Sequence, residues 1–198
     1  MIVLYTEQSV RVNRSFSASA RGLFIDAGQL IHLRGSAMRT LFDTSESRTL
    51  AFQRLVLATV IGAHGVQKAF GWFGGFGYDG TMQFFTSLGV PAVLGFLVIL
   101  GETLGALGLL LGAATRIAAA GVTATMLGAV AMVHWKYGFY MNWGGNLGGE
   151  GFELHLLALG LSLPLVALGG GAWSLDRWIA RALSTLGMGS LRSVALFE

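Results

Sequence analysis

The sequence predicts an all-α integral membrane protein, a four-helix bundle with short interfacial helices. The chain of 198 residues is 54% hydrophobic and 12% charged, about half the charged fraction that is usual in soluble domains. Its apolar residues gather in four segments of about 20 residues, the length of a helix that crosses the hydrocarbon core. The segments do not alternate apolar and polar residues, as strands of a membrane barrel do. They comprise residues 51–71, 91–112, 115–135 and 152–170.

These segments divide the chain into three parts. Residues 1–50 are expected to be a cytoplasmic extension that is in part disordered, and residues 51–171 the four-span membrane domain. Residues 172–198 are expected to form a cytoplasmic amphipathic tail. Two alternatives are open for the extension: residues 1–37 are translated, or Met38 is the true start.

The placement of arginines predicts the orientation of the spans. Cations gather before the first span, in the short turn that holds Arg116, and in the tail with Arg177 and Arg181. Positively charged segments stay in the cytoplasm, so we expect both termini inside. The formal net charge of +3 then follows from topology, and no nucleic-acid partner is expected.

Short helices are expected outside the spans. In the aromatic and glycine-rich loop after the first span, Asp79 favours a cap for a helix over residues 81–88. After the last span, Ser174 is the expected N-cap of an amphipathic helix, with Trp173 and Trp178 at the interface.

The second span carries a stripe of small residues beside a carboxylate. Glycines at three- and four-residue spacing let helix backbones approach closely, and Glu102 lies next to this stripe. A carboxylate in mid-membrane costs about 3 kcal/mol on insertion scales, so we expect Glu102 to turn toward other helices. The stripe consists of Gly101, Gly105, Gly108 and Gly112.

Counting residues from the ends of the spans predicts that a histidine lies close to this carboxylate. His64 lies roughly 20 Å from the inner end of the first span, and Glu102 roughly 16 Å from the outer end of the second. Both therefore fall in the outer half of the bundle. Lys68 shares a helical face with His64, where it either joins the cluster or extends to the lipid headgroups.

The fourth span adds two candidates that cannot both face inward. Glu153 and His155 are separated by roughly 200° around a helix, and we favour Glu153 as the inward residue. His134, at the outer end of the third span, either joins these polar residues at the outer end of the bundle or lies at the membrane interface. A metal site formed by His64, Glu102 and Glu153 is disfavoured because these residues lack a metal-binding spacing.

The order and spacing of these motifs resemble the DoxX family, over about Met38 to Arg181. That family comprises small four-helix proteins of the bacterial inner membrane, associated with membrane oxidoreductase complexes and named after a subunit linked to thiosulfate:quinone oxidoreductase. By position, the resemblance implies that the functional polar residues are His64, Lys68, Glu102, Arg116 and Glu153. The matching motifs are Arg54-Leu-Val-Leu, His64-Gly65 with Lys68, Gly71-Trp72-Phe73, Gly101-Glu102, Leu109-Leu-Leu-Gly112 with Thr115-Arg116, Gly151-Phe-Glu153-Leu and Trp173-Ser174-Leu175-Asp176.

We therefore expect a multi-pass protein of the bacterial inner membrane that serves as a subunit of a redox system and binds a quinone or a small sulfur anion. Glu102 and His64 are the expected catalytic residues; Lys68, Glu153 and Arg116 are expected to bind substrate. The chain has no cysteine, which excludes a dithiol mechanism and a cysteine-ligated iron–sulfur cluster. No covalent cofactor is expected, and electrons would pass through a quinone or through other oxidoreductase subunits. The alternative is a non-enzymatic membrane scaffold whose polar residues serve helix packing.

Overall fold

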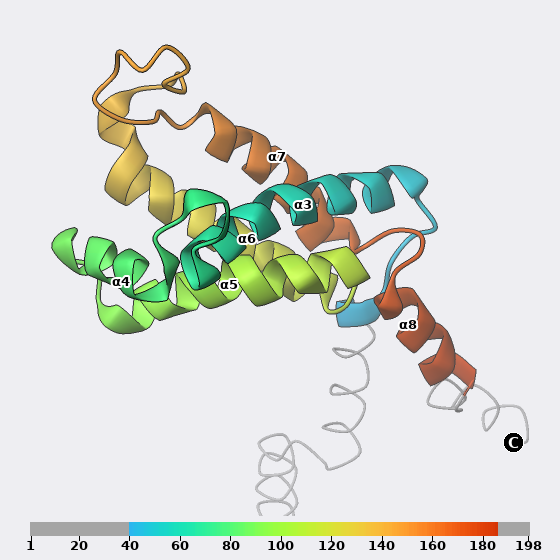
Figure 1. The fold of residues 1–198 in the computed structure, drawn as a ribbon. Coiled ribbons are helices and arrows are strands. Elements are labelled where there is room, and N and C mark those ends of the chain that lie inside the picture. Colours follow the sequence, from blue (N-terminus) through green and yellow to red (C-terminus); the bar gives the residue numbers. More distant parts are fainter. Residues whose placement is uncertain (1–39, 186–198) are drawn as a thin grey trace, which may run out of the picture. The chain divides into compact units, whose positions relative to one another are not determined.

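The computed structural model describes residues 40–185, and in this part of the chain helices are joined by loops, without a strand. The all-α prediction is therefore confirmed for the described part (Figure 1). Residues 1–37 and Met38 lie outside it. The elements are α3 (Arg48–Phe70), η1 (Trp72–Gly74), α4 (Gly77–Ser87), α5 (Ala92–Leu111), α6 (Thr115–Ala129), η2 (Val130–His134), η3 (Trp135–Tyr137), α7 (Glu153–Leu168) and α8 (Leu175–Thr185).

Three helical stretches are long and apolar enough to cross a membrane. They are α3, α5 and the continuous stretch Thr115–Tyr137, which joins α6 to η2 and η3. The fourth expected span corresponds to α7, which is equally apolar in character but has only 16 residues. At 1.5 Å per residue α7 is roughly 24 Å long, somewhat less than the hydrocarbon core.

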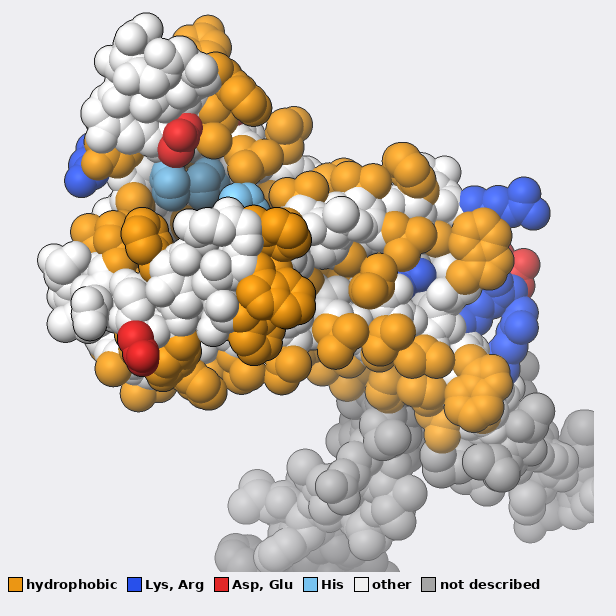
Figure 2. Space-filling model, in the orientation of Figure 1, with side chains coloured by type: hydrophobic (Ala, Val, Ile, Leu, Met, Phe, Trp, Pro, Cys, Tyr) orange, Lys and Arg blue, Asp and Glu red, His pale blue; other side chains and the backbone are white. Residues whose placement is uncertain are grey.

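Four helices pack around one apolar core (Figure 1). Helix α3 contacts α5 and α7, and α6 contacts the same two helices. Each contributes a fully buried side chain: Leu57, Leu109, Val122 and Leu165 have no exposed surface. The outward faces remain apolar, as a lipid environment requires; Figure 2 shows hydrophobic side chains along most of the visible surface.

The predicted glycine stripe lies where α5 meets α6. A Cβ atom on Gly101 would come within 3.8 Å of Thr125 Oγ1, and one on Gly108 would come within 3.1 Å of the Ala113 carbonyl oxygen. The stripe ends at Gly112, whose positive φ of 66° terminates α5. Its role in close helix packing is confirmed.

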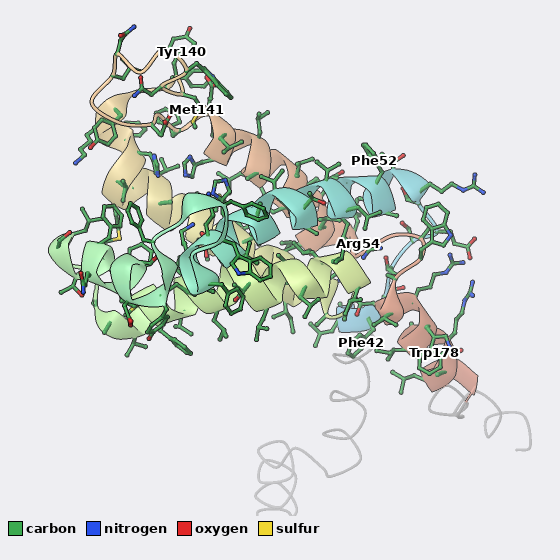
Figure 3. All side chains as sticks on the ribbon, viewed as in Figure 1. Phe42, Phe52, Arg54, Tyr140, Met141 and Trp178 are labelled. Carbon is green, nitrogen blue, oxygen red and sulfur yellow. The ribbon has the colours of Figure 1, made fainter. Side chains whose placement is uncertain are left out.

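At one end of the bundle, a buried arginine of α3 bonds to α5 and to the segment before α8 (Figure 3). Arg54 of α3 is 1% exposed. Its Nη1 donates to the Leu109 and Leu110 carbonyl oxygens of α5, at 2.5 and 2.9 Å. Its Nε and Nη2 donate to the Gly170 and Trp173 carbonyl oxygens, at 3.0 and 3.1 Å. The guanidinium therefore satisfies the carbonyl groups left free at the end of α5.

Asp176 completes this end of the bundle. Its carboxylate, in a residue that is 1% exposed, accepts hydrogen bonds from the backbone N–H groups of Ala114 and Thr115, at 2.6 and 2.8 Å. Asp176 thus caps α6, although it belongs to α8. Ser174 caps α8 as predicted, since its Oγ accepts from the Arg177 N–H at 3.3 Å.

The connections between helices are structured. The expected helix over residues 81–88 is present as α4, but it begins earlier, at Gly77, so Asp79 lies in its first turn and is not its cap. Its Met82 and Phe85 side chains pack against Gly95 of α5. In the loop before α7, Asn142 both donates to the Leu147 carbonyl oxygen and accepts from the Leu147 N–H.

Candidate functional site

A lysine and a glutamate form an ion pair between α3 and α5. Lys68 Nζ lies 2.5 Å from Glu102 Oε2; the Glu102 side chain is 5% exposed and that of Lys68 28%. The expectation that Glu102 turns inward is confirmed. A buried carboxylate is unfavourable unless it is paired, and Lys68 supplies the counter-charge that this position requires.

Two glycines of α3 bring these residues together. A Cβ atom on Gly65 would lie 2.6 Å from the Glu102 carbonyl oxygen, and one on Gly62 would lie 3.4 Å from Ala106 Cβ. The backbones of α3 and α5 therefore cross in close contact at Gly65. Lys68 follows one helical turn later and reaches the Glu102 carboxylate from there.

His64 lies near the pair but is not bonded to Glu102. It interacts electrostatically with both Lys68 and Glu102, and its side chain hydrogen-bonds with Gln67. The residue as a whole is exposed. The structure therefore shows Lys68, and not His64, as the direct partner of the carboxylate.

Two further histidines meet beside His64. The rings of His134, at the end of η2, and His155, in the first turns of α7, have centroids 4.1 Å apart. His134 Nδ1 lies 2.8 Å from the Glu150 carbonyl oxygen. His155 interacts electrostatically with His134, His64 and Lys68. Its Nδ1 is buried and has no hydrogen-bond partner in the described part of the chain.

The two candidates of α7 are placed differently from the expectation. His155, not Glu153, contacts His134, whereas Glu153 Oε1 accepts a 3.3 Å hydrogen bond from Trp143 Nε1 in the preceding loop. The reason is the irregular backbone before α7, where the Phe139 carbonyl oxygen holds the Glu153 N–H at 2.9 Å. This contact directs the first residue of α7 toward the loop.

Arg116 lies at the other end of the bundle. Its Nη1 donates to the Val166 and Ala167 carbonyl oxygens of α7, and its Nη2 to the Asp43 carbonyl oxygen. Along the same helical stretch it is roughly 27 Å from His134. The expected grouping of Arg116 with the other substrate-binding residues is therefore not found; it satisfies the last carbonyl groups of α7.

We call the residues brought together here the polar cluster: His64, Lys68, Glu102, His134 and His155. Figure 2 shows histidine side chains in a recess of the surface, next to an acidic side chain. Such a cluster offers hydrogen-bond donors, acceptors and proton-exchanging groups within an apolar protein. Among residues 40–185, no three His, Asp or Glu side chains are arranged to hold a metal ion.

Sequence reasoning missed the pairing of His134 with His155. The signal that points to it is the π-helical turn of η2, Val130–His134, because an extra residue in a helical turn changes the direction of the side chains that follow. A π-helical turn is not readable from residue types, and so the position of His134 was open.

The comparisons with known proteins agree with this architecture. The DoxX family model matches residues 49–135, a range that includes Lys68, Glu102 and His134. The chain is also similar to a protein of Bacillus subtilis (strain 168) named "Putative oxidoreductase CatD". The two are 29% identical over 112 residues, which is 57% of this chain and 74% of the relative. No solved structure matches the chain.

Proposed function

We propose that this chain, in which the DoxX family model matches residues 49–135, is a membrane subunit of a redox system that binds a quinone in the polar cluster. The observation that carries this proposal is the buried Lys68–Glu102 pair with three histidines around it. Quinones are apolar molecules with two hydrogen-bonding oxygens, and their reduction consumes two protons and two electrons. A recess lined by neutral donors and proton-exchanging groups suits both needs.

The charge balance of the cluster favours a neutral ligand. Lys68 is the cation of the cluster, and the Glu102 carboxylate at 2.5 Å already compensates it. An anion would have to compete with this carboxylate in a medium that screens charge weakly. A small sulfur anion remains the second candidate, favoured by the donors on Lys68 and His64.

Each residue has a proposed role. Glu102 is the buried acid, His64 and Lys68 donate hydrogen bonds to ligand oxygen, and Glu153 is the gate at the outer end. The chain contains no cysteine for an iron–sulfur cluster, so electrons come from a partner oxidoreductase subunit. The name of the Bacillus subtilis relative, "Putative oxidoreductase CatD", supports the redox assignment.

The proposed setting is the bacterial inner membrane, with α7 as the fourth span and both termini in the cytoplasm. The supporting observation is charge. Arg48 begins α3, and Arg177 and Arg181 pair with Glu46 just before it, so these three arginines lie at the opposite end of α3 from Lys68. Positively charged ends face the cytoplasm, which puts the polar cluster in the outer half.

Binding of a short-chain quinone tests the proposal. The full chain, reconstituted in lipid nanodiscs, carries five tryptophans whose fluorescence a bound quinone quenches. We expect saturable quenching that weakens about tenfold or more in Glu102→Gln and His64→Ala. Glu46→Gln is the matched control, because Glu46 pairs with Arg177 and Arg181 at the other end.

Two outcomes would contradict quinone binding. Saturable binding of thiosulfate without quinone binding would assign the cluster to a sulfur anion. If neither ligand binds, and Glu102→Gln changes only the resistance to unfolding, the chain is a scaffold whose polar residues serve packing.

A further inference from the structure

His155 carries a buried ring nitrogen that lacks a hydrogen-bond partner in the described part of the chain. Its Nδ1 is buried without a partner, and no described residue bonds to its other ring nitrogen. A buried polar atom without a partner is unfavourable, so natural proteins seldom retain one without a use. The other two unpaired atoms, Thr115 Oγ1 and Arg116 Nε, lie at the opposite end, in residues held by further hydrogen bonds.

Unlike His155, the neighbouring His134 has a contact that selects its tautomer. The Glu150 carbonyl oxygen, 2.8 Å from His134 Nδ1, can only accept a hydrogen bond, so Nδ1 of His134 carries the hydrogen. In the neutral ring Nε2 of His134 is then the acceptor. No comparable contact selects the tautomer of His155.

His155 is surrounded by other titratable side chains. The His134 ring of η2 has its centroid 4.1 Å away. His64 and Lys68 of α3 also interact with His155, and the Lys68 charge is compensated by Glu102 of α5. Two imidazolium rings at such a separation would repel each other. A neutral imidazole has one donor and one acceptor nitrogen, and the two exchange roles between tautomers.

We propose that His155 binds the redox-active oxygen of the ligand, donating a hydrogen bond to a quinone carbonyl and accepting one from a quinol hydroxyl. This inference rests on the proposed function and names the ligand class more sharply, as a quinone/quinol couple. A quinone oxygen only accepts hydrogen bonds, whereas the hydroxyl of the quinol also donates. A ring whose tautomer the protein leaves free can serve both, which a lysine ammonium cannot. An oxidised sulfur anion accepts in every state and would need no such freedom.

The experiment measures the binding of ubiquinone-1 and of ubiquinol-1 to the full chain in nanodiscs. Tryptophan quenching reports the quinone, and displacement of bound quinone reports the quinol. His155→Phe removes both nitrogens and keeps an aromatic ring, whereas His155→Gln retains a donor and an acceptor. We expect His155→Phe to weaken both ligands about tenfold and His155→Gln to restore most of the loss. Glu46→Gln is the control far from the cluster, and circular dichroism checks that each variant is folded.

The remaining outcomes separate the two proposals. If wild-type protein binds neither ligand, the proposed function and this inference both fail. If wild type binds both and folded His155→Phe binds them equally well, this inference fails and the quinone site stands without His155. A loss confined to one oxidation state, or an equal loss in folded His155→Gln, would overturn the proposed exchange of donor and acceptor roles.

Discussion

Lys68 Nζ lies 2.5 Å from Glu102 Oε2, and this ion pair bridges α3 and α5, whose backbones cross in close contact at Gly65. Because the Glu102 side chain is only 5% exposed, the negative charge of the carboxylate is compensated by the lysine and not by solvent. Removal of one partner should therefore cost more than removal of both.

The first prediction concerns stability of this pair. Lys68→Met leaves a buried carboxylate unpaired and should lower the free energy of unfolding by about 3 kcal/mol. The double variant Lys68→Met/Glu102→Gln should recover at least half of that loss, because the amide carries no charge. Unfolding of the reconstituted protein with increasing concentrations of a denaturing detergent measures the free energy of unfolding of the single and the double variant. Additive effects of the two single replacements would show that the pair is not coupled.

The second prediction tests the close crossing of α3 and α5. Gly65→Ala places a Cβ atom 2.6 Å from the Glu102 carbonyl oxygen, so the helices must separate. We expect a loss of about 1–3 kcal/mol in the free energy of unfolding. Gly121→Ala is the matched control in another spanning helix, because a Cβ atom there meets nothing within 4 Å. Equal stability of the two variants would contradict the crossing at Gly65.

The third prediction concerns the buried arginine. Arg54→Gln removes most of the donors to the Leu109, Leu110, Gly170 and Trp173 carbonyl oxygens. Since hydrogen bonds from a charged group contribute about 1.5–3 kcal/mol each, the variant should lose at least roughly 3 kcal/mol or fail to accumulate. Arg48→Gln, on an exposed residue of the same helix, should have little effect. Thermal aggregation in detergent compares the two, and similar midpoints would refute the structural role of Arg54.

The fourth prediction addresses topology and uses the absence of cysteine. A single cysteine introduced as Asn146→Cys, in the exposed loop before α7, should react with a membrane-impermeant maleimide in intact cells. Ser184→Cys, in α8, should react only after the cells are permeabilised. If both react in intact cells, the short helix α7 does not cross the membrane and the predicted fourth span is wrong.

Residue types and their order were enough to predict several features. Helix lengths follow from apolar runs, because the bilayer sets the length of a spanning helix. The burial of Glu102 follows from the cost of a charge in hydrocarbon. The cap at Ser174 follows from its hydroxyl, which accepts from the free N–H groups of a helix start. Each of these is a local or one-dimensional property.

Relations between helices depended on the three-dimensional packing. The partner of Glu102 is Lys68 and not His64 because α3 and α5 cross at Gly65. The inward residue of α7 is His155 and not Glu153, because the preceding loop holds Glu153 through its backbone N–H and its carboxylate. Helix rotation and crossing are set by the contacts among several helices at once, and depth counting along one helix cannot supply them.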